Sequence, residues 1–147
     1  MKKTKLLAIL ISLTVLMTAF IFSNSMKNSE ESNETSDTFL SILTPITEFL
    51  DGVFGEADWN YIIRKGAHLT EFCILGVLVS NTVFRIKIDY GKHLMGYGLF
   101  YVLLVAVTDE FIQSFSDRTS SVSDVLIDLT GALTGIIIVA LLSSRKK

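Results

Sequence analysis

The chain has 147 residues, of which 50% are hydrophobic and 19% charged, and its mean hydropathy is +0.51. A single cysteine excludes an internal disulfide and a zinc site built from several cysteines. The length fits one domain, and the abundance of apolar residues excludes a disordered chain. The formal net charge of −2 indicates no particular partner, and we expect no binding to nucleic acid.

The apolar residues are gathered in four blocks that contain few charges. Each block approaches the ~20 residues that a helix needs to cross ~30 Å of hydrocarbon, and single strands cannot satisfy their backbone in lipid. We therefore predict an all-α fold, an integral membrane four-helix bundle that forms a single domain over residues 1–147. The predicted spans and loops are residues 6–22, 61–84, an inner loop at 85–93, 94–112, an outer loop at 113–123, and 124–142.

The first block has two interpretations. Lys2, Lys3 and Lys5 before an apolar run also describe a secretory signal peptide. The apolar run is somewhat longer than a usual signal core, and the bulky residues Phe20 and Phe22 stand where a cleavage site needs small ones. We therefore predict a retained span and keep the signal peptide as the alternative.

Basic residues are unevenly distributed over the connecting segments. If the N-terminus is cytoplasmic, the inner segments hold nine of the 13 basic residues and one acid, Asp89. This distribution is the positive-inside bias of membrane proteins. It predicts that both termini lie on the cytoplasmic side.

The first outer segment (residues 23–60) divides into two parts. Residues 23–38 are rich in Ser, Asn, Glu and Thr, which predicts a flexible acidic stretch. Residues 39–54 carry apolar side chains at helical spacing, which predicts an amphipathic helix on the extracytoplasmic surface or capping the bundle. Pro45 falls in its first turns or bends it. Trp59 follows, where aromatic residues anchor a span at the membrane interface.

Ionisable side chains recur at one end of three predicted spans, which the topology assigns to the outer leaflet. Arg64, His68 and Glu71 share one helical face, because their spacing is i, i+4, i+7. A charge at the bilayer centre costs about 2.5–3.5 kcal/mol on insertion scales, so such residues should face one another or a wet cavity. The predicted functional cluster consists of Arg64, Lys65, His68, Glu71, Asp109, Glu110, Gln113, Arg118, Asp124 and Asp128.

Purely structural roles explain several of these residues equally well. Asp124 follows two serines and is a candidate N-cap of the fourth span. His68 and Glu71 can form one hydrogen-bonded lock between helices. Gly131 and Gly135 form a GxxxG pattern, which usually means close helix packing.

The acids suggest two chemical roles. His68 and Glu71 with Asp109 and Glu110 could bind a divalent metal through one nitrogen and three carboxylates. Carboxylates near a histidine could also do acid–base chemistry on a headgroup. The chain has no GxSxG motif and no phosphate-binding glycine loop, so an enzyme is the less favoured alternative and no catalytic residue is assigned. We expect no metal and no cofactor.

The favoured hypothesis is a polar cavity that binds a ligand of the cell envelope. Arg64, Lys65 and Arg118 would contact the anionic part of that ligand. A transporter would need polar residues that continue towards the inner side, and the spans offer almost none. A purely structural bundle stays an alternative.

Two stretches of the chain resemble the signatures of a known family. The stretch from Arg64 to Gly76 reads R-K-x-x-H-x-x-E-F-x-x-L-G and resembles the first signature of the VanZ-like family of bacterial membrane proteins. The stretch from Asp109 to Arg118 reads D-E-x-x-Q-x-F-x-x-R and, with the later GxxxG pair, resembles the second. The order and separation of the signatures and the four-span layout agree with the family.

This chain departs from the family pattern at three places. Ile112 stands where the family often has a histidine, and residues 116–117 replace a Pro-Gly turn. Asp128 stands where the family often has an amide, which adds a negative charge to the cluster.

The resemblance implies a protein of the bacterial plasma membrane. The founding member of the family is associated with resistance to teicoplanin, a glycopeptide antibiotic that targets a lipid-linked cell-wall precursor. The resemblance therefore implies that membrane lipids, a cell-wall lipid precursor or a lipoglycopeptide are the partners. The alternative is an integral membrane hydrolase or transferase that acts on a lipid-linked substrate.

Overall fold

The computed structural model describes residues 2–116 and 121–144, and over these residues it contains five α-helices and no strand. Four of the helices are long and apolar enough to cross a membrane, namely α1, α3, α4 and α5. The predicted all-α architecture with four candidate spans is thereby confirmed. The helices are α1 (Lys2–Ser25), α2 (Ser29–Phe54), α3 (Trp59–Tyr90), α4 (Met95–Gln113) and α5 (Val122–Ser144).

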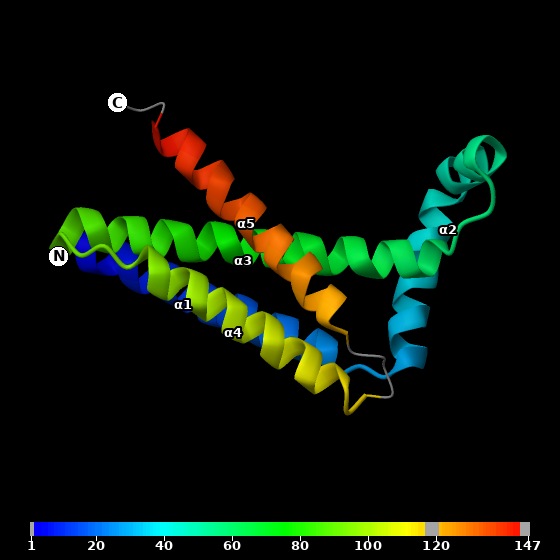
Figure 1. Ribbon diagram of the computed structural model, residues 1–147, viewed down its shortest axis with the longest axis horizontal. Helices are drawn as coiled ribbons and strands as arrows, with labels where there is room; N and C mark the ends of the chain where they lie inside the picture. The colour runs from blue at the N-terminus through cyan, green and yellow to red at the C-terminus, as the bar shows by residue number, and fades with distance from the viewer. Residues whose placement is uncertain (1, 117–120, 145–147) are drawn as a thin grey trace.

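Helix α3 is the centre of the bundle and contacts each of the other four helices. Figure 1 shows α1 and α4 running along one side of α3, while α5 crosses it obliquely. Helix α2 stands across the far end of α3, away from both chain termini. We call the end at which α1 and α4 stop and α3 and α5 begin the polar end of the bundle.

Glycines on α5 let this helix approach α3 closely. A Cβ atom on Gly131 would collide with the backbone carbonyl of Leu69, and one on Gly135 would collide with that of Cys73. Both glycines are buried and lie one helical turn apart on the same face. The packing role predicted for the GxxxG pair is thereby confirmed.

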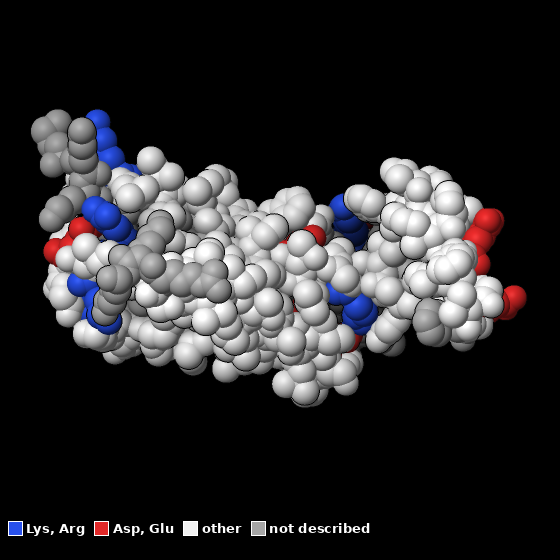
Figure 2. Space-filling model, turned by 90° about the horizontal axis from the view of Figure 1, so that it is seen from above, with Lys and Arg blue, Asp and Glu red and all other residues white. Residues whose placement is uncertain are grey.

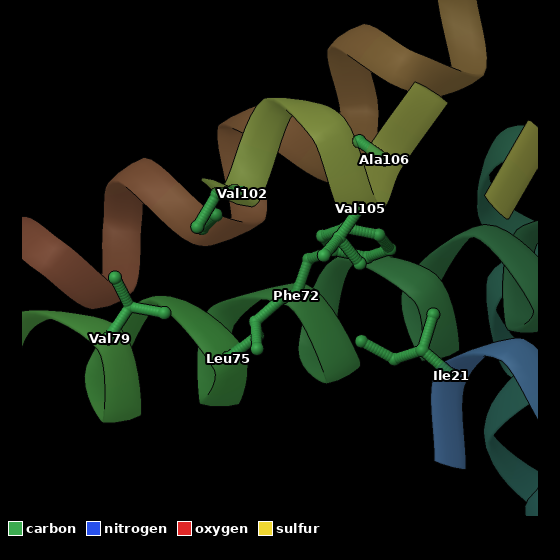
Figure 3. Close-up of a cluster of buried hydrophobic side chains, with 8 residues drawn as sticks. Ile21, Phe72, Leu75, Val79, Val102, Val105 and Ala106 are labelled. Atoms are coloured by element: carbon green, nitrogen blue, oxygen red, sulfur yellow. The ribbon is translucent and has the colours of Figure 1, made fainter. Parts of the chain in front are cut away.

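The buried apolar core is small and lies between α1, α3, α4 and α5, while many large apolar side chains face outwards. On the face shown in Figure 2, an uncharged band separates charged side chains near the chain termini from those near the polar end. An uncharged belt is the surface that a hydrocarbon environment requires. The core residues labelled in Figure 3 are Ile21, Phe72, Leu75, Val79, Val102, Val105 and Ala106.

Helix α3 is longer than the span predicted from hydropathy. Residues 85–90, predicted to belong to an inner loop, continue the helix as far as Tyr90. Gly91 ends it in the left-handed conformation, with φ of 68°, and its N–H donates to the Lys87 carbonyl over 2.9 Å. Hydropathy shows where a helix leaves the hydrocarbon, whereas the glycine cap decides where the helix ends.

The prediction of a flexible stretch over residues 23–38 is wrong. Helix α1 continues to Ser25, and α2 already begins at Ser29. A capping box starts α2, because the Asn28 side chain accepts from the Glu31 N–H over 2.8 Å and the Glu31 carboxylate accepts from the Asn28 N–H. This pair of hydrogen bonds offsets the low hydrophobicity of the first turns.

Helix α2 exposes most of its large apolar side chains. Ile42 is 72% exposed and Phe49 is 68% exposed, whereas the small polar residue Thr47 is buried. Pro45 lies inside the helix rather than in its first turns. At the far end, the Trp59 indole N–H donates to the Asp51 carboxylate over 2.9 Å and fixes the corner between α2 and α3.

Candidate functional site

Three ionisable side chains from three helices meet near the polar end. The Nδ1 atom of His68 on α3 lies 3.6 Å from Oδ2 of Asp109 on α4 and 3.6 Å from Oδ1 of Asp128 on α5. Both carboxylates are fully buried, at 0% and 1% exposure. The structure therefore brings these three predicted residues into direct proximity, and we call them the His–Asp cluster.

Neighbouring polar groups fix the Asp109 carboxylate at both oxygens. The hydroxyl of Ser25 on α1 donates to Oδ1, and the Gln113 amide donates to Oδ2 over 2.7 Å. Ser25 and Gln113 are themselves buried. A buried carboxylate held at both oxygens has little freedom to turn, so Asp109 presents a fixed oxygen to His68.

Glu71 is also held by a residue of α1. Its carboxylate accepts from the side-chain amide of Asn24 over 2.8 Å. The sequence does not indicate Asn24 and Ser25 as site residues, because the first span carries no charge. The signal was the polar run at residues 23–25, which ends that span at the same membrane side as Glu71.

Glu110 connects α4 with the start of α5. Its carboxylate accepts from the backbone N–H of Ser121 over 3.0 Å. Glu110 is buried, and it closes the polar end between the two helices. Arg118, which the sequence assigns to the cluster, lies outside the described residues.

Lys65 and Asp124 form an ion pair between α3 and α5. The predicted role of Asp124 as an N-cap is wrong, because the Ser121 hydroxyl accepts from the Ser123 N–H in the capping position. Asp124 lies in the first turn instead, where a negative charge is favourable at the positive end of the helix dipole. The Lys65 ammonium also lies 5.3 Å from the ring centre of Tyr61.

A pocket of about 340 Å³ opens between α1, α2 and α3 next to the His–Asp cluster. Two basic residues line it, Lys27 and Arg64, and both are half-buried. The Nε atom of Arg64 is shielded from solvent and has no hydrogen-bond partner among the described residues. The other lining residues are Phe20, Asn24, Ser32, Thr35, Ser36, Phe39, Ile63, Ala67, His68 and Glu71.

The chain matches the family described as VanZ/LLP1 over residues 9–143, which includes both signature stretches, the second and third candidate spans in full and most of the first and fourth. This chain belongs to the VanZ-like family. Comparison with curated proteins found no match, and comparison with solved structures found none either.

The predicted cluster of this VanZ-like protein divides into parts with different surroundings. Asp109 and Asp128 meet His68, while Arg64 faces the pocket and Lys65 is bound to Asp124. His68 belongs to both regions, because it also lines the pocket, where Glu71 stands as well. Chemically, the pocket offers cationic groups and apolar walls, and the adjacent cluster offers buried carboxylates and an imidazole.

Lys27 is the basic residue of the pocket that the sequence did not indicate. It follows α1 and is not part of the cluster predicted from the sequence. Its role depends on α2, because the helix that begins at Ser29 forms the wall opposite α3. A flexible stretch at this point would have formed no such wall.

Proposed function

We propose that this VanZ-like protein binds an anionic, lipid-linked ligand in the pocket between α1, α2 and α3. One observation carries the proposal: a half-buried Arg64, whose Nε lacks a hydrogen-bond partner among the described residues, shares that pocket with Lys27. Arginine beside lysine is a favourable arrangement for a phosphate or diphosphate group.

The ligand class follows from the combination of charge and apolar walls. Phe20, Phe39 and Ile63 stand beside the cationic groups, so one molecule with a polar head and an apolar chain can contact both. A volume of about 340 Å³ falls within the range of small-molecule sites and fits a headgroup rather than a whole lipid. A cell-wall lipid precursor or a lipoglycopeptide has this chemistry, which would connect the protein to teicoplanin resistance.

The proposed location is the bacterial plasma membrane, with both termini cytoplasmic and the pocket facing the extracytoplasmic side. The charge bias of the sequence supports this orientation. In this arrangement α2 is an amphipathic helix at the outer surface, where its exposed Ile42, Ile46 and Phe49 side chains enter the lipid. Ligands would then reach the pocket from the outer leaflet.

The experiment measures binding of a short polyprenyl diphosphate to the protein in phosphatidylcholine nanodiscs. The polyprenyl alcohol of the same chain length is the neutral reference. We expect the diphosphate to bind more tightly, because a hydrogen bond to a charged group contributes about 1.5–3 kcal/mol. Arg64→Gln should therefore weaken diphosphate binding about 10- to 150-fold.

Lys65→Gln is the matched comparison for Arg64→Gln. It removes one positive charge from the next residue of α3, but Lys65 is ion-paired with Asp124 and does not line the pocket. Its effect on diphosphate affinity should be less than about threefold. Equal binding of the alcohol and the diphosphate, or equal losses in the two variants, would contradict the proposal.

A second candidate function is hydrolysis or group transfer at the phosphate of a lipid-linked substrate. The observation that favours it is the presence of His68 and Glu71 in the wall of the anion-binding pocket. This function predicts turnover of envelope lipids in proteoliposomes, and loss of turnover without loss of folding in Glu71→Gln. Absence of turnover in the unaltered protein, together with diphosphate binding, would leave binding as the function.

A further inference from the structure

The His–Asp cluster has the geometry of a metal-binding site. One ligand atom from each of His68, Asp109 and Asp128 lies within 4.8 Å of the others, and two of the separations are 3.6 Å. Nitrogen and oxygen ligands bound at ~2.1 Å in tetrahedral geometry lie ~3.4 Å apart. The three side chains therefore surround a point that a single ion can occupy with little movement.

A buried oxygen of this cluster lacks a partner within the described residues. Oδ2 of Asp128 is shielded from solvent and accepts no hydrogen bond from the described residues, and the residue as a whole is only 1% exposed. Its other oxygen is directed at the His68 ring. Burying an ionised carboxylate costs on the order of several kcal/mol unless an opposite charge or hydrogen bonds compensate it.

The surrounding charge has the sign that attracts a cation. Glu71, Asp109 and Asp128 lie close to a single imidazole, and among residues 2–116 and 121–144 no Lys or Arg forms an ion pair with these three acids. One divalent ion would offset much of this excess. Ser25 and Gln113 already hold Asp109 in place by hydrogen bonds. Carboxylates that bind metals usually have such hydrogen-bond partners.

We propose that His68, Asp109 and Asp128 bind one divalent transition-metal ion of the Zn²⁺ or Mn²⁺ type. An imidazole with carboxylates suits these ions, whereas Mg²⁺ and Ca²⁺ prefer oxygen ligands alone. This ligand set differs from the one that the sequence suggests, which contains Glu71 and Glu110 in place of Asp128. Glu71 is engaged by Asn24 and Glu110 by the Ser121 backbone, and Asp128 supplies the third ligand instead.

The test uses the full chain in nanodiscs, with any purification tag removed and bound metal stripped by a chelator. Zn²⁺ and Mn²⁺ are titrated separately, and binding is measured by calorimetry and by metal analysis after desalting. We expect one ion per chain and no displacement by millimolar Mg²⁺. Asp128→Asn and His68→Gln should each weaken binding more than about 100-fold, because even residues that only orient a ligand contribute 10- to 100-fold.

Asp124→Asn is the matched control. It removes the same charge from α5 one turn before Asp128, but Asp124 is paired with Lys65 and lies outside the three-residue group. Its metal affinity should stay within about threefold of the unaltered protein. The proposal is overturned if the unaltered protein binds no stoichiometric Zn²⁺ or Mn²⁺, if Mg²⁺ competes equally, or if the three variants have the same affinity.

The result for the unaltered chain decides the matter even if a variant fails to fold. Variants are compared only when they elute as a single species of the expected size and keep their helical circular dichroism. Metal binding is measured without any diphosphate ligand. Its failure therefore leaves the proposed ligand pocket standing, and failure of diphosphate binding leaves the metal site standing.

Discussion

His68 on α3 and Asp128 on α5 bring an imidazole nitrogen and a carboxylate oxygen to 3.6 Å of one another inside an apolar bundle. The residue after His68 is Leu69, whose backbone carbonyl lies against Gly131, three residues beyond Asp128. The close contact of two backbones therefore holds the two polar side chains together. The glycine packing and the polar cluster are parts of one arrangement.

Gly131→Ala should destabilise the protein, because the new methyl group would collide with the Leu69 backbone. Overpacking of this kind costs about 1–3 kcal/mol. Thermal unfolding in detergent micelles measures the effect. Gly66→Ala is the control, since a Cβ there meets nothing within 4 Å and alanine favours a helix. Equal unfolding temperatures for the two variants would show that α5 does not pack on α3 as described.

Ser25→Ala should also lower stability, for a different reason. The substitution removes the hydroxyl that donates to Asp109 and leaves a buried carboxylate oxygen without that bond. Such a loss costs about 1–3 kcal/mol, and more when the group is charged. The free energy of unfolding is compared with that of Ser23→Ala, which alters an exposed serine two residues earlier. A Ser25→Ala variant as stable as Ser23→Ala would exclude a contribution from this hydrogen bond.

The predictable part of the fold was the part governed by hydropathy and by charge. Four charge-poor blocks gave the candidate spans, and the positions of His68, Asp109 and Asp128 along three of them indicated a common level in the bundle. Ionised side chains are costly in hydrocarbon, so their shared level carried information about contact. The GxxxG pattern at Gly131 and Gly135 was informative for a similar reason, because small residues permit close packing.

The missed features depend on hydrogen bonds that hydropathy does not record. Asn24 and Ser25 are neutral, and their contact with the acids became visible only when α1 was packed beside α3 and α4. The capping box at Asn28 and Glu31 was present in the sequence, but the acidic composition around it favoured the prediction of a flexible stretch. Ser121 rather than Asp124 caps α5, because its hydroxyl accepts from the Ser123 N–H.

The orientation of the chain can be measured with single cysteines in a Cys73→Ala background. Asn33 and Lys92 are both exposed; Asn33 lies in α2, which precedes α3, and Lys92 follows α3. An impermeant maleimide added to intact cells should label Asn33→Cys, because that residue is proposed to be extracytoplasmic. Lys92→Cys should react only after the membrane is permeabilised. The reverse pattern would contradict the proposed orientation and the outer position of the pocket.

The central claim is that ionisable side chains of separate helices meet in one buried cluster. A double-mutant cycle with His68→Gln and Asp128→Asn, measured as free energies of unfolding in detergent, tests this claim most directly. Residues in contact show interaction energies of about 0.5–3 kcal/mol, and we predict a value in this range. The reference cycle pairs His68→Gln with Asp89→Asn. Asp89 is ion-paired with Arg85 near the other end of α3, so the interaction energy of this cycle should be close to zero. Equal and negligible interaction energies in both cycles would contradict the account.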